Sequence, residues 1–333
     1  MKHCPVRLAM NAHLMKGLVF ILSWSLWPCF ALTQNYPVKP IRFLIAFTPG
    51  GPSDLLARLV GNGLAQQLGQ SFIYDNRPGA GGNVAGEMAA KSAADGYTLL
   101  LANNSILATN AALYKKMSFD PVKDLAPIVL LASQANILVV HPDLPVHSVK
   151  ALIALARTHP GSLNYASSGS GAAAHLSAEL FQSLTHTRMV HIAYKGAAPA
   201  LMDTLSGQCQ LMFATSLSVV PYIRSEKLRP LAVTTATRSA IFPQLMTIAE
   251  AGVPGFEATT WHGIVAPAGL DKSLILKLNL QVNALLSAHA LHDRLLALGA
   301  DILGGTPEAF ARYIQKEIPK WSALIEHSGA RAD

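Results

Sequence analysis

The chain has 333 residues, of which 51% are hydrophobic and 14% are charged, and its formal net charge is +7. This length and hydrophobicity suffice for a large core and exclude an intrinsically disordered protein. Its arginines and lysines do not cluster with aromatic residues, so we expect no nucleic-acid partner.

The N-terminal residues predict a secretory signal peptide. Three basic residues precede the apolar segment 17–27, with no acidic residue among them. This segment is short for a membrane span and is followed by a small-residue pattern that ends at Ala31, so we expect residues 1–31 to be removed during secretion. A retained membrane anchor would need a longer apolar segment, and lipidation of Cys29 would need small residues before it. Met15 is an alternative start.

Without that segment the chain carries a formal charge of +4, because its three basic residues leave with it. A mildly positive body attracts small anions. Cys209 is then the one remaining cysteine, which excludes an intramolecular disulfide. The remaining histidines form neither an HExxH motif nor a cluster at metal-ligand spacing, so we expect no metal and no cofactor.

Strand and helix patterns alternate after the signal segment. Residues 41–47 form an apolar, β-branched run, and leucines at helical spacing follow it until Gly69. Residues 71–74 and 96–102 are further strands, separated by a glycine-rich turn and an alanine-rich helix. This alternation indicates an α/β protein with parallel strands.

The second part of the chain continues the pattern. Residues 125–142 are long enough for two strands or for one long connecting strand. Residues 172–184 are a helix that follows a glycine-serine turn, and two longer helices are expected at 273–298 and 307–325. Since no flexible linker is present, we expect two α/β lobes connected by strands, with a hinged ligand cleft between them. The expected division is residues 36–130 for the first part of lobe 1, 131–250 for lobe 2, and 251–333 for the return to lobe 1.

The glycine turn in the segment TPGGPSD is the first candidate site. It lacks the Lys-Ser/Thr of a P-loop and the GxGxxG pattern of a dinucleotide site. Gly50 and Gly51 would let the backbone approach a ligand at a helix N-terminus, and Asp54 in the first turn favours the helix dipole. The segment alone fits an anion site and a tight corner about equally well.

A second loop, SSGSG, has the same character. Its hydroxyl and backbone N–H groups could hold a carboxylate at the N-terminus of the next helix. A hydrolase would use Ser168 or Ser170 as the nucleophile and His175 as the base. The G-x-S-x-G spacing is absent and no acidic residue is placed to orient His175, so binding is favoured over catalysis. Trp261 and His262 either pack in the core or form a wall of the cleft.

Taken in order, these segments resemble the tripartite tricarboxylate transporter receptor family, the TctC-like or Bug extracytoplasmic solute receptors. The resemblance runs from about Tyr36 to Gly329. The segments that carry it are FTPGGPSDLLAR, NRPGAGGNVAGEMAAK, ADGYTLLLAN, NYASSGSGAAAHLSAELF, YKGAAPALMDTLSGQ, LRPLAVTTATRS, AEAGVPGFEATTWHGIVAPAG and TPEAFARYIQKEIPKWSALIEHSG.

The resemblance implies a periplasmic-binding-protein fold of type II, with two lobes that close on a carboxylate, and no enzymatic activity. It implies as ligand-binding residues Gly50, Gly51, Asp54, Asn103, Ser167, Ser168, Gly169, Gly171, His175 and Thr215. Relatives recognise di- and tricarboxylates, acidic amino acids or aromatic carboxylates. Family members often carry an acidic residue where Thr215 and its neighbours follow Phe213, so a ligand with an amino group is disfavoured here.

The resemblance also implies the partners. The receptor would be a monomer that delivers its ligand to the membrane permease subunits of a tripartite transporter. A receptor that serves a signalling partner would have the same residues, and the sequence leaves that alternative open. The identity of the ligand is left open too.

Overall fold

The computed structural model of the chain describes Met1, His3, residues 36–239 and residues 241–328. From Lys39 onward the chain forms one compact unit. Apart from Met1 and His3, the predicted signal peptide (residues 1–31) lies outside the described residues. Within those described ranges, no single helix is both long enough and apolar enough to cross a membrane.

The first lobe is built on three parallel strands, with β1 between β2 and β3. Ile41, Phe43, Leu44 and Ile45 of β1 are all fully buried. Such a nearly continuous apolar run is typical of a parallel strand that is covered on both faces. The elements are β1 (Ile41–Ile45), α2 (Pro52–Leu68), β2 (Phe72–Asn76), η1 (Ala80–Gly82), α3 (Asn83–Ala90), β3 (Thr98–Asn103), η2 (Ser105–Thr109) and α4 (Asn110–Leu113).

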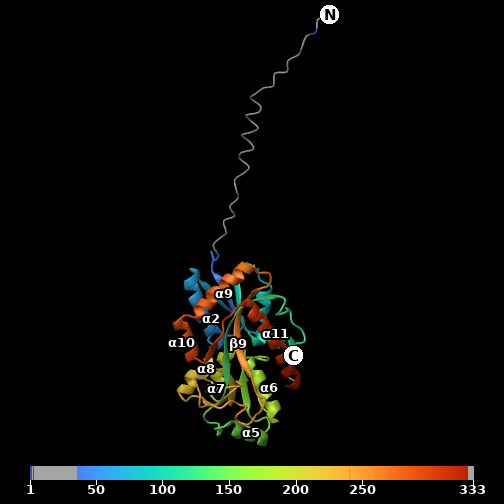
Figure 1. Cartoon of the computed structure of the whole chain (residues 1–333). Helices are drawn as coiled ribbons and strands as arrows, with labels where there is room; N and C mark the ends of the chain where they lie inside the picture. The colour runs from blue at the N-terminus through green and yellow to red at the C-terminus, as the bar shows by residue number, and fades with distance from the viewer. Residues whose placement is uncertain (2, 4–35, 240, 329–333) are drawn as a thin grey trace. The chain divides into compact units, whose positions relative to one another are not determined.

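Two long strands run from the first lobe into the second. β4 (Leu125–Val140) is one strand of 16 residues, so the segment predicted as two strands or one connecting strand is the connecting strand. Its first part pairs with β9 (Thr259–Pro267), and its last part pairs with β7 and β8 of the second lobe. In Figure 1, β9 runs through the middle of this unit. The side chains of β4 and β9 therefore lie where the two lobes meet.

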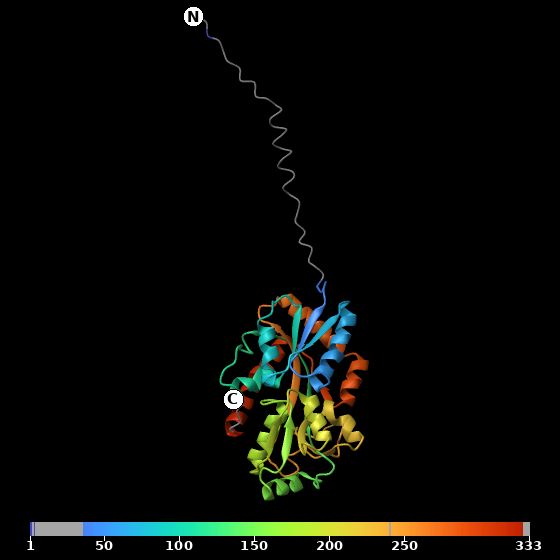
Figure 2. The same ribbon diagram turned by 180° about the vertical axis from the view of Figure 1, so that it is seen from behind.

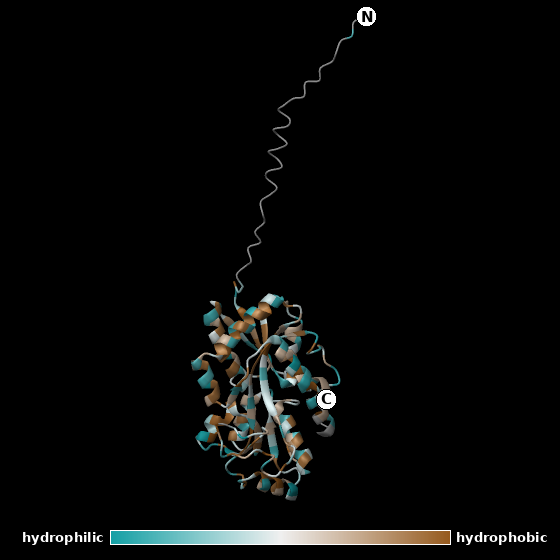
Figure 3. Ribbon diagram, in the orientation of Figure 1, coloured by the Kyte–Doolittle hydropathy of each residue, from teal (hydrophilic) through white to brown (hydrophobic). Residues whose placement is uncertain are grey.

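The second lobe repeats the architecture of the first. Strand β5 lies between β6 and β7 and is parallel to both. Figures 1 and 2 show helices on both faces of the sheet, and Figure 3 shows that the outer helices carry both hydrophilic and hydrophobic residues. The elements are α5 (Val149–Thr158), β5 (Asn164–Ser167), α6 (Ala173–Thr185), β6 (Val190–Ala193), α7 (Ala197–Leu205), β7 (Leu211–Thr215), α8 (Ser216–Arg224) and β8 (Arg229–Val233).

The C-terminal part returns to the first lobe through β9. It continues with α9 (Lys272–Leu286), α10 (His289–Ala297), β10 (Ala300–Ile302) and α11 (Pro307–Ser328). The single helix predicted for 273–298 is wrong, because α9 and α10 meet at an angle of 69°. Ala288 between them has an extended backbone, and the bend lets α10 bury Leu291 and Leu295 on its own inner face.

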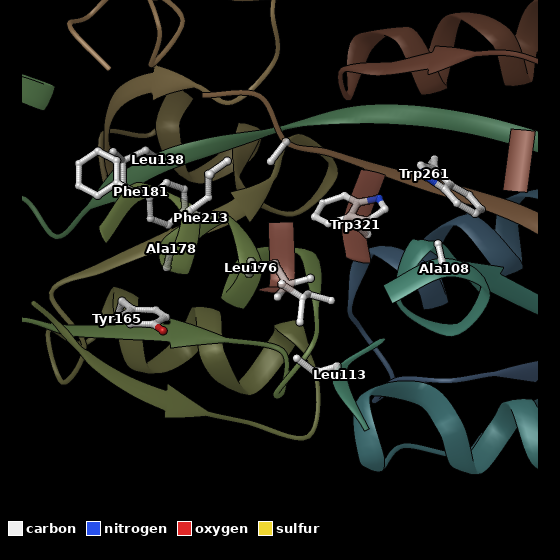
Figure 4. Packing of buried hydrophobic residues seen from close by; sticks show 14 of the residues in the cluster. Ala108, Leu113, Leu138, Tyr165, Leu176, Ala178, Phe181, Phe213, Trp261 and Trp321 are labelled. Carbon is white, nitrogen blue, oxygen red and sulfur yellow. The ribbon is translucent and has the colours of Figure 1, made fainter. Parts of the chain in front are cut away.

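The core includes both tryptophans of the C-terminal return (Figure 4). Trp261 and Trp321 each donate from Nε1 to Oε2 of Glu317, at 2.9 Å in both cases. Glu317 is buried, and these two hydrogen bonds satisfy its carboxylate inside the core. Trp261 therefore has a packing role, as is usual for a tryptophan.

The α/β class and the periplasmic-binding-protein fold predicted from the sequence are confirmed. The continuous sheet follows the order β2-β1-β3-β9-β4-β7-β5-β6, and parallel groups at both ends are joined by antiparallel β4 and β9. The domain boundaries at residues 130 and 250 stay predictions.

Candidate ligand-binding site

One cavity lies where four helices begin. It has a volume of about 40 Å³, which is room for about three water molecules. Its walls come from the start of α2, α6, α7 and α8, and from strands β3, β7 and β9. The lining residues are Phe47, Pro52, Ser53, Asn103, Ser168, Ala172, Ala173, Ala174, Ala197, Met212, Phe213, Thr215, Thr260 and His262.

The four helices all begin without a side-chain cap, as α3, α4 and α10 also do. Their N-cap residues are Gly51, Ala172, Gly196 and Thr215, and none of the four forms a side-chain cap hydrogen bond. The first N–H groups of an α-helix have no partner inside the helix, and the helix dipole places partial positive charge there. An anion in the cavity would meet this partial positive charge from several sides.

None of the residues that line this cavity is charged at neutral pH. Its polar side chains are hydroxyls, an amide and the imidazole of His262. Burial lowers the pKa of His262 to about 4, so this ring is neutral at pH 7. The described residues also contain no group of three or more histidines, cysteines or carboxylates that could hold a metal ion. The field in the cavity therefore comes from backbone dipoles.

The first loop is held by a carboxylate. Gly50 has a φ of 80°, a conformation that favours glycine. Asp54 accepts hydrogen bonds from Gly50 N at 3.0 Å, from Arg58 Nε at 3.0 Å and from Asn76 Nδ2 at 3.1 Å. Burial alone would raise the pKa of Asp54, but these hydrogen bonds outweigh it and hold the pKa below its ordinary value. Asp54 thus fixes the loop as an ionised group.

The second loop is held by neutral histidines. Gly171, with a φ of 80°, donates from its backbone N to His175 Nδ1 at 3.1 Å. The ring of His175 stacks on His191 with 4.1 Å between centroids, and His191 Nε2 lies 2.6 Å from Ser167 Oγ. Burial lowers the pKa of both histidines to about 4, and the proximity of His175 lowers that of His191 further.

The two lobes touch around these loops. A Cβ atom on Gly196 would overlap Thr48 Oγ1, so the first loop packs directly on the start of α7. From the other side, Ser105 Oγ and Thr109 Oγ1 each donate to the carbonyl of Gly171 at 3.3 Å. Residues of the two lobes are therefore in contact at both loops.

The predicted site residues fall into two groups. Asn103, Ser168 and Thr215 line the cavity. The others are not lining residues: Gly50, Gly51, Gly169 and Gly171 are in the turns beside the cavity, Ser167 ends β5, and Asp54 and His175 are in the first turns of α2 and α6. Among the described residues, no hydrogen bond joins Ser168 or Ser170 to His175, whose Nδ1 accepts from Gly171.

Sequence reasoning missed part of the cavity wall. Ser53 and Thr260 line it and were not among the predicted site residues. His262, expected either in the core or in a wall of the cleft, lines the cavity, and its Nε2 lies 2.9 Å from Ser53 Oγ. The alternation of side chains along a strand could have separated buried Trp261 from its neighbours on the opposite face. The pairing with Ser53 had no local signal, because these residues are 209 positions apart.

The chain was compared with known families and proteins. Residues 56–330 match the model described as tripartite tricarboxylate transporter family receptor. Protein BugT of Bordetella pertussis is 37% identical over 299 residues, which cover 90% of this chain and 92% of that protein.

Solved structures of two proteins are similar to this chain along most of its length. A structure of an R. palustris protein with adipate has 38% sequence identity and a TM-score of 0.87, and the match covers 89% of this chain and 99% of that one. MatC from Rhodopseudomonas palustris with bound malate has 30% identity and a TM-score of 0.84, with 87% and 100% covered.

Proposed function

This chain belongs to the tripartite tricarboxylate transporter receptor family, and on that premise we propose that it is a periplasmic receptor that binds a small organic carboxylate. The observation that carries the proposal is the convergence of four uncapped helix N-termini on one cavity without charged lining residues. The similar structures with adipate and malate support the same ligand class.

The carboxylate would be held by neutral donors. The backbone N–H groups at the starts of α2, α6 and α7 and the hydroxyls of Ser53, Ser168 and Thr215 surround the cavity. Hydrogen bonds from such groups to a carboxylate are charge-assisted and stronger than those between neutral groups. Ordered water can bridge the longer gaps. Together these donors replace the hydration shell of the anion.

The remainder of the ligand would be apolar and would lack an ammonium group. The lining also includes Phe47, Met212, Phe213 and several alanines, which suit a hydrocarbon segment. No carboxylate lines the cavity to pair with an ammonium group. We therefore expect dicarboxylates with an unsubstituted chain, or aromatic acids, to bind better than acidic amino acids.

The predicted residues outside the cavity wall would act by shaping it. Asp54 and His175 hold the backbones of the two loops by accepting from Gly50 N and Gly171 N, and these glycines supply the positive φ that the turns require. Closure would be a rotation of the lobes about β4 and β9, with the lobes divided near residues 130 and 250. The cavity has room for about three water molecules, so the lobes would have to separate to admit a ligand of the size of adipate.

The biological context follows from the same premise. Residues 1–31 would direct export, and the loaded receptor would deliver its ligand to the permease subunits of a tripartite transporter. Ser53 and His262 are a hydroxyl and an imidazole in contact in the cavity, but the other ring nitrogen of His262 faces the amide of Gln134 and not a carboxylate. On this ground and that of the family, we expect binding without turnover.

A thermal-shift screen tests the function. The candidates are adipate, succinate, malate, citrate, benzoate and aspartate, and a ligand present at 100 times its Kd should stabilise the protein by about 2.7 kcal/mol. We expect a shift with adipate or benzoate that exceeds the shift with aspartate. No shift with any of the carboxylates would refute the proposal.

A substitution ties the shift to the cavity. Ala173 lines it at the start of α6, so Ala173→Leu should fill the space and abolish the ligand-induced shift. Ala154→Leu on the exposed face of α5 is the matched control and should leave the shift unchanged. If Ala173→Leu retained the full shift, the ligand would bind elsewhere.

A further inference from the structure

His262 connects the cavity to a buried amide. Its Nε2 lies 2.9 Å from Ser53 Oγ, and its Nδ1 lies 3.3 Å from Gln134 Nε2. The three residues come from the N-terminus of α2, from β9 and from β4, and all are buried. Ser53 and His262 line the cavity, whereas Gln134 lies behind the ring.

We propose that Gln134 and His262 form a relay that fixes the Ser53 hydroxyl as a hydrogen-bond donor toward the ligand carboxylate. This inference rests on the proposed function and names a specificity-determining arrangement within that site. His262 is a positioning residue in this relay, because it acts on the ligand through Ser53.

The direction of the relay follows from the chemistry of its groups. The relay takes the Gln134 amide in the orientation of this structure, with Nε2 toward the ring and Oε1 buried without a hydrogen-bond partner among the described residues. An amide nitrogen can only donate, so Nδ1 of His262 accepts this hydrogen bond. In a neutral imidazole the other nitrogen then carries the proton, and Nε2–H donates to Ser53 Oγ. The hydroxyl hydrogen of Ser53 is thereby left for a group in the cavity.

The relay requires an uncharged ring, and the surroundings of His262 favour one. The ring is almost fully buried, and burial lowers its pKa to about 4. No charged side chain lines the cavity beside it. At neutral pH, Nδ1 therefore keeps the lone pair that receives the Gln134 hydrogen bond.

The relay would select ligands that can accept a hydrogen bond from Ser53. A carboxylate oxygen can accept the hydrogen that Ser53 presents, whereas an ammonium group has only donors. Leaving a buried donor unpaired is costly, so a ligand that cannot accept there is rejected. The relay thus gives the cavity a preference for anions without a cationic side chain.

The neighbouring Thr260 provides a control inside the same cavity. It lies two residues before His262 on β9 and also lines the cavity. Its Oγ1 donates to Asn136 Oδ1 at 3.0 Å, so its hydrogen bond is directed away from Ser53. Thr260→Val therefore changes the cavity wall without changing the relay.

A double-mutant cycle with adipate tests the relay, with affinity measured by titration calorimetry. Ser53→Ala should weaken binding about tenfold, since it removes one hydrogen bond to a charged group. His262→Phe should weaken binding by a similar factor, and the double variant should be no worse than Ser53→Ala alone. Thr260→Val should change the affinity less than either.

The outcomes separate the two proposals. If the double variant lost affinity by the product of the two single losses, or if His262→Phe did not change the affinity, the relay would be overturned. The proposed receptor function would not be affected by either result. If the unsubstituted protein bound none of the screened carboxylates, the proposed function and the relay would both be overturned.

A second measurement does not depend on any ligand or on the folding of a variant. Long-range proton–nitrogen NMR of the histidines at pH 7 reports which ring nitrogen of His262 carries the proton. We expect the Nε2–H form, and Gln134→Leu should allow the other form to appear. An Nδ1–H ring in the unsubstituted protein would contradict the relay directly.

Discussion

The two loops that border the cavity do the same work with different chemistry. Each follows a parallel strand, turns at glycines and leads into an uncapped helix N-terminus. The first is held by the ionised carboxylate of Asp54, with Arg58 and Asn76 as partners. The second is held by His175 and His191, two neutral rings stacked in the second lobe.

This difference shows that the groups that hold the two loops do not determine the electrostatic field in the cavity. Asp54 is neutralised by Arg58 on its far side, and the histidines carry no charge at neutral pH. Neither support therefore cancels the partial positive charge of the helix N-termini. The two supports should nevertheless respond differently to acid and to substitution.

The largest expected effect is that of pH on stability. His175, His191 and His262 have a pKa of about 4 in the fold, with burial as the first cause, against about 6.5 in an unfolded chain. Between these values the unfolded chain binds more protons, so the free energy of unfolding falls as pH drops. From pH 7 to pH 5 we expect a loss of about 2 kcal/mol for each histidine, measured by urea denaturation.

The supports of the two loops should differ in the pH at which their contribution to stability is lost. The pKa of Asp54 lies below its ordinary value of 3.8, so its contribution is present above that value and is lost only at lower pH. Asp54→Asn should leave the slope between pH 7 and pH 5 unchanged, whereas His175→Phe should reduce it. A flat profile in the unsubstituted protein would show that the histidines titrate normally.

The second largest effect is the loss of stability when Asp54, which supports the first loop, is replaced at constant pH. Asp54→Asn removes the charge that accepts three hydrogen bonds, and we expect it to lower the free energy of unfolding by about 3 kcal/mol at pH 7. Asp95→Asn is the matched control, because Asp95 forms an exposed ion pair with Lys39 and should cost at most about 0.5 kcal/mol. Equal losses in the two variants would mean that Asp54 does not support the loop.

The smallest expected effect is the loss of stability when His175, which supports the second loop, is replaced. His175→Phe keeps a ring to stack on His191 but leaves the backbone N of Gly171 without its acceptor, so we expect a loss of about 1.5 kcal/mol. His147→Phe, at an exposed position, is the control and should change little. A loss no larger than the control would assign the support of this loop to packing alone.

Much of this could be predicted from local patterns. Alternating strands and helices, and glycines between them, are properties of a few consecutive residues, and the α/β class follows from them. The ordered family motifs extended this to the periplasmic-binding-protein fold. The two loops at Gly50 and Gly169 were found because a turn from a strand into a helix often requires a positive φ, which glycine adopts readily.

Other features could not be predicted in this way. A run of apolar residues at 125–142 does not reveal whether one strand or two will form, since that depends on the partners β9 and β7 on either side. The break at Ala288 also lacks a proline or glycine signal and reflects where α9 and α10 find buried contacts. Asp54 and His175 were among the predicted residues, but the partners that they contact were not predicted.

The sequence by itself determined the class of fold, the family and the two loops, because each depends on short segments or on their order. Only the tertiary structure decided that Ser53, Gln134 and His262 meet beside one cavity. Their approach depends on the register between β4 and β9 and on where α2 begins, and these depend on packing across the whole sheet. Contacts between residues so far apart along the chain have no local pattern that could reveal them.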